Sequence, residues 1–147
     1  GQRSFGPMRP QVVFGKEYFN HANSEIATFA MIETQSAINN FDEILSVENL
    51  TGVYIGPADM SISYGLEPKF DVIEDPIYSN IKMIATKAKE KNKIAGIHNG
   101  SIEYAKEMIN LGYKFITISS DFRAMTSTAQ SIINKMKNQD KKNQSTY

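Results

Sequence analysis

Short apolar runs alternate along the chain with longer segments whose apolar residues recur every three or four positions. Each short run is bounded by polar or turn-forming residues and is too short for a typical helix, as expected of a parallel strand buried on both faces. These predicted strands lie at residues 26–32, 52–55, 94–97 and 115–119. The longer segments predict amphipathic helices at residues 36–45, 75–91, 101–111 and about 124–137, with a shorter helix at about 16–23.

Capping and turn residues mark several of these boundaries. Asp75 before Pro76 is typical of a helix start, with the aspartate as N-cap and the proline in the first helical position. Ser101 is a predicted N-cap, and Gly112 is a predicted helix end. Loops are predicted at residues 1–10 and 56–65, and a frayed tail at residues 139–147, which are rich in Lys, Asn and Gln.

Strand and helix alternate four times, so the predicted fold class is α/β with four parallel β/α units. Such units build either a small doubly wound sheet or part of a (β/α)8 barrel. A complete barrel needs about 250 residues, and this chain has 147. We therefore expect residues 1–147 to form a single partial domain, half a barrel with two open sheet edges. Because the chain begins at Gly1 instead of Met, we expect it to be part of a longer gene product.

The composition argues against several classes of function. Hydrophobic residues make up 41% of the chain and charged residues 22%, as in ordinary globular domains. Lys plus Arg and Asp plus Glu each total 16, so no basic excess favours a nucleic-acid partner. The absence of Cys removes disulfides, thiolate nucleophiles and cysteine zinc sites. No apolar run approaches the roughly 20 residues of a membrane span and no signal peptide is visible, so we expect a cytoplasmic protein without a membrane partner.

Two acidic residues follow consecutive predicted strands. Glu33 comes directly after "FAMI", and Asp59 lies in "GPAD" after "GVYI". Loops after the carboxyl ends of parallel strands carry the chemistry of α/β folds, so both carboxylates are expected on one edge of the sheet, within reach of one hard cation. The alternative is that Glu33 is a helix N-terminal residue favoured by the helix dipole and Asp59 is a turn residue.

The stretch "FAMIETQSAINNFDEILSVENLTGVYIGPADMSISYG" resembles the metal-dependent class II pyruvate aldolases of the HpcH/HpaI family. The segments "GQRSFGPMRP" and "AGIHNGSIEYAKEMINLGYKFITISSD" fit the same family, so the likeness covers nearly the whole chain. The pair of I-E-T at a strand end and G-P-A-D about twenty-five residues later is the specific part of the resemblance. It implies the second half of a (β/α)8 barrel of the phosphoenolpyruvate/pyruvate type.

The resemblance also implies a site. Glu33 and Asp59 would be the metal ligands, for Mg²⁺ or Mn²⁺ with Co²⁺ as a further possibility. The backbone of Gly56, Pro57, Ala58 and Asp59 would form a tight loop that receives the carboxylate of pyruvate. A divalent ion bound to the keto oxygen and carboxylate of pyruvate stabilises the enolate formed on carbon–carbon cleavage.

A lysine Schiff base is the competing aldolase strategy. Lys93 and Lys114 directly precede strands, which places both at the opposite edge from the predicted site. The sequence therefore favours the metal route over the imine route.

The resemblance covers only the second half of the family's barrel. The first half of the family's barrel supplies the arginine, histidine and aspartate of the family site, and no position here matches those motifs. The catalytic residues therefore stay unassigned. We do not expect activity from this chain alone. Some relatives have a substrate-contacting glutamine where this chain has Met31, so no particular aldehyde is inferred.

His98 follows the third predicted strand, and two interpretations stay open: a solvated or hydrogen-bonded loop residue, or a residue of the site.

The resemblance implies a lyase that cleaves a 2-keto-3-deoxy (4-hydroxy-2-oxo) acid to pyruvate and an aldehyde. The alternatives are a citrate-lyase-type or malyl-CoA-type lyase and a non-catalytic half-barrel assembly module. Multimers that exchange the last helix between subunits are a further implication. An apolar stripe on that predicted helix, Met125, Ile132, Ile133 and Met136, would then pack on a partner or, alternatively, on the chain's own strands.

Overall fold

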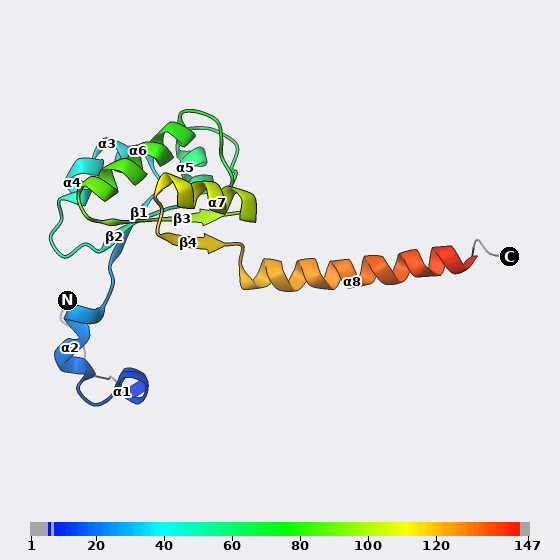
Figure 1. Ribbon diagram of the computed structural model, residues 1–147, viewed down its shortest axis with the longest axis horizontal. Coiled ribbons are helices and arrows are strands. Elements are labelled where there is room, and N and C mark those ends of the chain that lie inside the picture. The colour runs from blue at the N-terminus through cyan, green and yellow to red at the C-terminus, as the bar shows by residue number, and fades with distance from the viewer. Residues whose placement is uncertain (1–5, 7, 145–147) are drawn as a thin grey trace.

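A single sheet of four parallel strands organises the protein, which is described by a computed structural model over residue 6 and residues 8–144, with backbone only for residues 138–144 (Figure 1). The strands are β1 (Phe29–Ile32), β2 (Gly52–Ile55), β3 (Ile94–Asn99) and β4 (Phe115–Ile118). The helices are α1 (Met8–Phe14), α2 (Tyr18–Glu25), α3 (Gln35–Asn39), α4 (Phe41–Leu45), α5 (Pro57–Ser63), α6 (Ile77–Glu90), α7 (Ile102–Leu111) and α8 (Asp121–Gln144).

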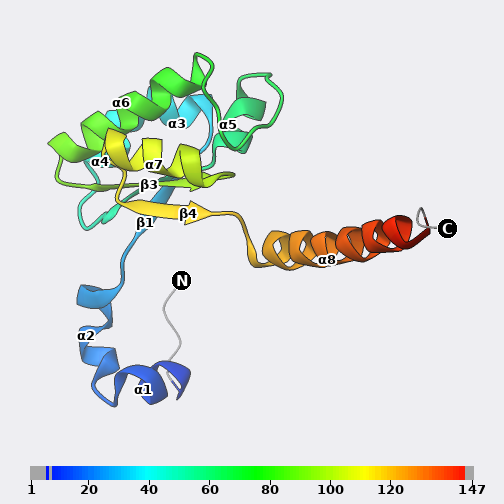
Figure 2. The ribbon, with the colours of Figure 1, turned by 45° about the vertical axis from the view of Figure 1, so that its right-hand side comes forward.

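The strand order distinguishes the two architectures that the sequence left open. Consecutive strands are neighbours in the order β1-β2-β3-β4, and helices α3 to α7 lie on one face of the sheet (Figure 2). A doubly wound sheet has helices on both faces, whereas a (β/α)8 barrel has its helices on the outside only. The prediction of four parallel β/α units from half of a barrel is therefore confirmed.

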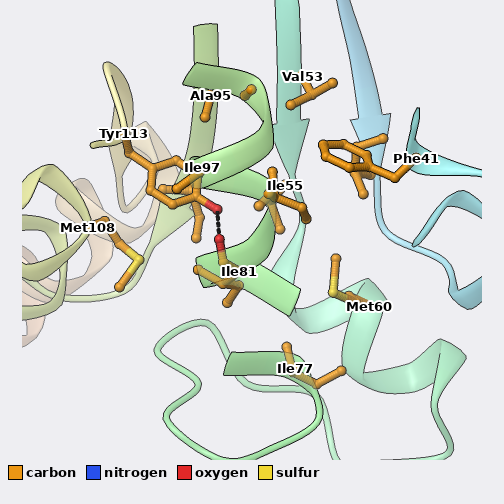
Figure 3. Packing of buried hydrophobic residues seen from close by; sticks show 14 of the residues in the cluster. Phe41, Val53, Ile55, Met60, Ile77, Ile81, Ala95, Ile97, Met108 and Tyr113 are labelled. Carbon is orange, nitrogen blue, oxygen red and sulfur yellow. Dashed lines mark hydrogen bonds between the residues drawn. The ribbon is translucent and has the colours of Figure 1, made fainter. Parts of the chain in front are cut away.

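The hydrophobic core lies between the sheet and these helices (Figure 3). Every second strand residue points to this face, and the strands contribute the buried residues Ile32, Val53, Ile55, Ala95 and Ile97. Helix α6 supplies Ile77, Ile81, Ile84 and Ala88, all fully buried and spaced as the sequence predicts. The Tyr113 hydroxyl donates a hydrogen bond of 2.8 Å to the Ile81 carbonyl and so ties the start of β4 to α6.

The opposite face of the sheet, here called the open face, carries the alternate strand residues Phe29, Met31, Gly52, Tyr54, Ile94, Gly96, His98, Phe115 and Thr117. Three of its rings pack together, with the Phe115 centroid 5.2 Å from that of Phe29 and 5.4 Å from that of Tyr54. Gly52 and Gly96 provide the room, because a Cβ on either would come within 2.8 Å of Phe29 or Tyr54.

The prediction of strands buried on both faces is wrong for this second face. Met31 is 51% exposed and Phe115 is 41% exposed. Other described segments do not cover these residues, because α1 and α2 extend away from the amino end of β1 (Figure 1). The apolar run therefore has one face in the core and one face outside it.

Several predicted boundaries also need correction. Of the loop predicted at residues 1–10, residues 8–10 lie in helix α1 instead. Residues 1–5 and 7 of that loop lie outside the described residues. The loop predicted after β2 contains α5, which has Pro57 in its first turn and Asp59 near its positive N-terminal end. The predicted helix at residues 36–45 is divided into α3 and α4 at Asn40. Strand β1 begins only at Phe29, since Ile26 still caps α2.

Helix ends elsewhere follow the sequence closely. The Ser101 hydroxyl accepts a hydrogen bond from the Tyr104 amide at the start of α7, and Gly112 ends that helix with a φ of 106°. The prediction of Asp75 as the N-cap of α6 is wrong by one residue, because Pro76 is the N-cap and the helix begins at Ile77. The Asp75 carboxylate still accepts a 3.0 Å hydrogen bond from the Ser79 amide. A hydrogen bond from the Ser79 hydroxyl, and to a smaller extent the one from the Ser79 amide, lowers the pKa of Asp75.

The last helix departs most from expectation. Helix α8 begins at Asp121, earlier than predicted, and its backbone continues to Gln144 through most of the predicted frayed tail. It projects away from the sheet in both views (Figures 1 and 2). The alternative in which its apolar stripe packs on the chain's own strands is therefore wrong, and Met125, Ile132, Ile133 and Met136 are between 45% and 66% exposed.

Candidate functional site

The carboxyl edge of the sheet brings four residues into one row on the open face. Ile32 pairs with Ile55, and Ile97 pairs with both Ile55 and Ile116. The residues that directly follow these four are Glu33, Gly56, His98 and Thr117. Because strand residues alternate between faces, this next row points away from the core. Consecutive β/α units thus place one residue each at the same level of the edge.

The carboxylates of Glu33, from this row, and Asp59, from α5, converge above Gly56. A Cβ built on Gly56 would lie 3.1 Å from Oε2 of Glu33 and 3.5 Å from Oδ2 of Asp59. Both carboxylates therefore surround one point directly above Gly56, and the absence of a side chain there keeps that point free. The geometric prediction that strands β1 and β2 bring these two acids together is correct.

Within the described part of the chain, no neighbour neutralises the carboxylate of Glu33 or Asp59. Among the residues that the structure describes, no hydrogen bond or ion pair involves the side chain of Glu33 or Asp59. Two adjacent carboxylates without a cationic partner form a set of oxygen donors suited to a hard divalent cation, which uses one or two carboxylates and completes its shell with water and substrate oxygens. The described residues contain no cluster of three or more His, Cys, Asp and Glu.

The segment after β2 is a helix N-terminus instead of the predicted tight loop. Gly56 is the N-cap of α5 and Pro57 its first residue, and the Met60 amide bonds to the Gly56 carbonyl. Proline has no N–H to offer. The amides of Ala58 and Asp59 have no partner within the described part of the chain, as is usual in a first helical turn. Of the four residues predicted to receive the pyruvate carboxylate, Pro57 alone therefore offers no backbone donor.

A cavity of about 190 Å³ opens beside this edge. Its wall is lined by Met31, Tyr54, Gly56, Pro57, Ala58, Asp59, Phe70 and His98. All four residues predicted to bind substrate are present, and Met31 lies where the resemblance places a substrate-contacting residue. His98 was predicted to be a solvated or hydrogen-bonded loop residue or a residue of the site. The loop position is wrong, because β3 continues through Asn99 and His98 is a half-buried strand residue, but its ring is hydrogen-bonded, to Thr117.

Tyr54 and Phe70 are cavity residues that the sequence analysis did not select. Tyr54 could have been found from strand alternation, because it lies between the buried residues Val53 and Ile55. Phe70 comes from the long connection between α5 and α6, and no periodic signal places that connection in space.

This connection is held against β3 and α7 by two hydrogen bonds. The Asp71 carboxylate accepts a 2.7 Å bond from the Gly100 amide, and the Tyr104 hydroxyl donates a 2.6 Å bond to the Val72 carbonyl. Burial raises the pKa of Tyr104 well above the usual range for a phenol, and the nearby carboxylates of Glu107 and Asp71 raise it further. The connection is therefore a fixed wall of the cavity.

The two lysines considered for Schiff-base chemistry are remote from this edge. Lys93 precedes β3, and its ammonium donates a 2.6 Å hydrogen bond to the Leu50 carbonyl just ahead of β2. Lys114 precedes β4, and its amide bonds to the Ala95 carbonyl. Both lie at the amino edge of the sheet, as predicted.

The chain is similar in sequence to known proteins. Residues 4–128 match the HpcH/HpaI aldolase/citrate lyase family. The chain belongs to this family. It is 37% identical over 133 residues to a hydroxypyruvate/pyruvate aldolase of Rhizorhabdus wittichii, covering 90% of this chain and 53% of that protein. It is 30% identical over 118 residues to a 4-hydroxy-2-oxo-heptane-1,7-dioate aldolase of Escherichia coli, covering 79% of this chain and 44% of that protein.

Solved structures support the same fold. An HpcH/HpaI aldolase/citrate lyase family protein from Burkholderia cenocepacia superposes with a TM-score of 0.78 at 20% identity, over 93% of this chain and 53% of that chain. An HpcH/HpaI aldolase from Desulfitobacterium hafniense gives a TM-score of 0.77 at 22% identity, over 93% and 54%. The HpcH/HpaI chain spans about half the length of the curated relatives it matches.

No helix in the described part of the chain is long and apolar enough to cross a membrane.

Proposed function

We propose that this HpcH/HpaI chain carries the metal- and pyruvate-binding edge of a lyase that cleaves a 4-hydroxy-2-oxo acid to pyruvate and an aldehyde. The single observation that carries the proposal is the convergence of Glu33 and Asp59 on Gly56 at the carboxyl edge of the sheet. Family membership supplies the reaction class, and the names of two relatives, a hydroxypyruvate/pyruvate aldolase and a 4-hydroxy-2-oxo-heptane-1,7-dioate aldolase, support the substrate class.

Glu33 and Asp59 would hold the cation, with Mg²⁺ or Mn²⁺ best suited to two carboxylates and Co²⁺ also compatible. When bound, such a cation supplies Lewis-acid stabilisation of the negative charge that develops on the pyruvate half during cleavage. Gly56 leaves the space above its Cα free for the cation and the oxygens of the substrate.

The first turn of α5 would bind the pyruvate carboxylate. Ala58 and Asp59 present backbone N–H groups at the positive end of the helix, and Pro57 sets the direction of this turn without offering a donor. Met31 and Tyr54 line the same cavity and would exclude water from one side of the reacting carbons.

Calorimetric titration of Mn²⁺ in the presence of pyruvate tests this proposal. The unmodified chain is expected to bind Mn²⁺ more tightly with pyruvate than without it. The double variant Glu33→Ala plus Asp59→Ala should lose this binding, because it removes both ligands. Glu48→Ala serves as the matched control, since Glu48 lies in the segment that leads into β2 at the other edge of the sheet. Equal Mn²⁺ affinity in the double variant and the control would rule the site out.

The partner proposed for this protein is a second copy of the chain, engaged by α8. The stripe of Met125, Ile132, Ile133 and Met136 is exposed on a helix that projects away from the sheet (Figure 1). Four exposed apolar residues on one helix are typical of a surface that a partner covers.

Sedimentation velocity at micromolar concentration tests this partner. Ile132→Glu plus Ile133→Glu should shift an assembly toward monomer, whereas Lys135→Glu on the same helix should leave it unchanged. A monomer for the unmodified chain at all concentrations would contradict the proposal.

A further inference from the structure

His98 lies beside the proposed metal site. In the row of residues at the carboxyl edge, His98 follows Ile97, and its neighbour on β2 is Gly56, above which Glu33 and Asp59 meet. Neighbouring strands are about 4.8 Å apart. The histidine thus stands one strand away from the cation position, on the side opposite Glu33.

The imidazole is oriented by a chain of two hydroxyl groups. Nδ1 of His98 lies 2.9 Å from Oγ1 of Thr117, and the same Oγ1 makes a short hydrogen bond with the Tyr54 hydroxyl. A phenol is the more acidic hydroxyl and therefore the better donor, so we assign the order of donation as Tyr54 to Thr117 to Nδ1 of His98. This order leaves the ring proton on Nε2.

The ring is also fixed by packing. Phe70 meets the imidazole edge to face, with centroids 5.2 Å apart. The connection that carries Phe70 is held by the bond from the Gly100 amide to Asp71, and a Cβ on Gly100 would lie 3.2 Å from Phe70. A side chain at this position would be tighter than usual against Phe70, so Gly100 favours this close approach.

We propose that His98 is a further substrate-binding residue, whose Nε2–H donates a hydrogen bond to the 4-hydroxyl of the oxo acid, the oxygen that leaves with the aldehyde. This inference rests on the proposed function, in which β1 and β2 bind the pyruvate half. His98 and Phe70 line the same cavity from the other side. Nε2 has no partner among the described residues, whereas Nδ1 is held by Thr117. Thr117 and Tyr54 act through the histidine and are positioning residues in this respect.

A matched pair of ligands tests this contact. 4-Hydroxy-2-oxobutanoate and 2-oxobutanoate differ only in the 4-hydroxyl, and the affinity of the chain for each is measured by titration with Mn²⁺ present. The unmodified chain should prefer the hydroxylated ligand by about threefold to tenfold, the range expected for one hydrogen bond. His98→Leu should remove this preference and change the affinity for 2-oxobutanoate by less than about twofold.

His21→Leu is the control, because His21 lies on α2, remote from the cavity. Tyr54→Phe and Thr117→Val keep the size of each side chain and should reduce the preference partly. Nitrogen-15 spectra of the imidazoles should show the Nε2–H form of His98 in the unmodified chain and a mixture of tautomers in Thr117→Val.

The outcomes separate the two proposals. Binding of 2-oxobutanoate that does not depend on Mn²⁺ or on Glu33 and Asp59 overturns the proposed function, and this inference with it. Metal-dependent binding with an unchanged preference in His98→Leu, or a proton on Nδ1 of His98, overturns this inference alone.

Discussion

The two faces of the sheet are built from the same strands but differ in what they hold. On the helix-covered face, Ile55 and Ile97 are fully buried against α6. On the open face, Tyr54 and His98 from the same strands line a cavity next to the carboxylates of Glu33 and Asp59. The comparison shows that residues one position apart have different surroundings, because strand side chains alternate between the core and the open face.

Removing a side chain from the covered face should have the largest effect. Ile81→Ala leaves a cavity at a fully buried position and should lower the free energy of unfolding by about 3–5 kcal/mol. Urea denaturation followed by circular dichroism measures the change. Ile109→Ala on α7, where the side chain is 55% exposed, is the control and should cost less than about 1 kcal/mol. Similar losses for the two variants would mean that the covered face is not the core.

The open face should also resist substitution where its backbone is crowded. A Cβ at Gly52 would lie 2.1 Å from the Ile94 carbonyl oxygen, so Gly52→Ala must displace β3 and should lower the free energy of unfolding by about 2–3 kcal/mol. Gly6→Ala is the control, since no atom of the described residues lies within 4 Å of the corresponding Cβ. The same denaturation experiment applies. A Gly52→Ala variant as stable as the control would show that the open face is loosely packed.

Buried phenols should make the covered side sensitive to alkaline pH. Burial raises the pKa of Tyr104 and Tyr113 above the ordinary value of 10.0. Above that pH the unfolded chain loses phenolic protons that the folded chain retains, so the free energy of unfolding should fall as pH rises from about 10. Unfolding midpoints measured between pH 9 and about 11.5 should show this decline.

Tyr104→Phe should make that decline shallower. At neutral pH the same variant should cost about 1–2 kcal/mol, because the Val72 carbonyl loses its donor. An alkaline slope identical to that of the unmodified chain would contradict the assignment of the decline to Tyr104.

The smallest effect is expected where the open face meets the proposed metal site. Glu33 and Asp59 are neighbouring carboxylates without a cationic partner among the described residues, so Glu33→Gln plus Asp59→Asn should raise the free energy of unfolding by up to about 1 kcal/mol in the absence of metal. Thermal unfolding in a chelating buffer measures the gain, with Glu90→Gln on α6 as the control. A clear loss of stability would favour the alternative interpretation, in which the two acids are structural.

Much of the fold could be predicted from the spacing of apolar residues. The four strands and the helices α6 and α7 lie close to their predicted positions, because short apolar runs and recurring apolar positions reflect a core that the chain itself supplies. Helix α5 was missed because the sequence analysis gave Gly56 and Pro57 weight as turn residues, although proline is also common in the first turn of a helix.

The candidate site was predicted only in part. Glu33 and Asp59 follow strands directly, so parallel pairing is enough to place them together. His98 was underestimated because β3 is two residues longer than its apolar run, and the extra pairing with Thr117 turns a predicted loop residue into one fixed on the open face.

By itself, the sequence determined the order of the β/α units and the edge at which Glu33 and Asp59 lie, since both follow from local periodicity and from the direction of parallel strands. Tertiary structure alone decided which face of the sheet the helices cover, how Phe70 reaches the cavity, and that α8 leaves the body of the protein. These features depend on contacts between residues far apart in the chain, and no local pattern of side chains records such contacts.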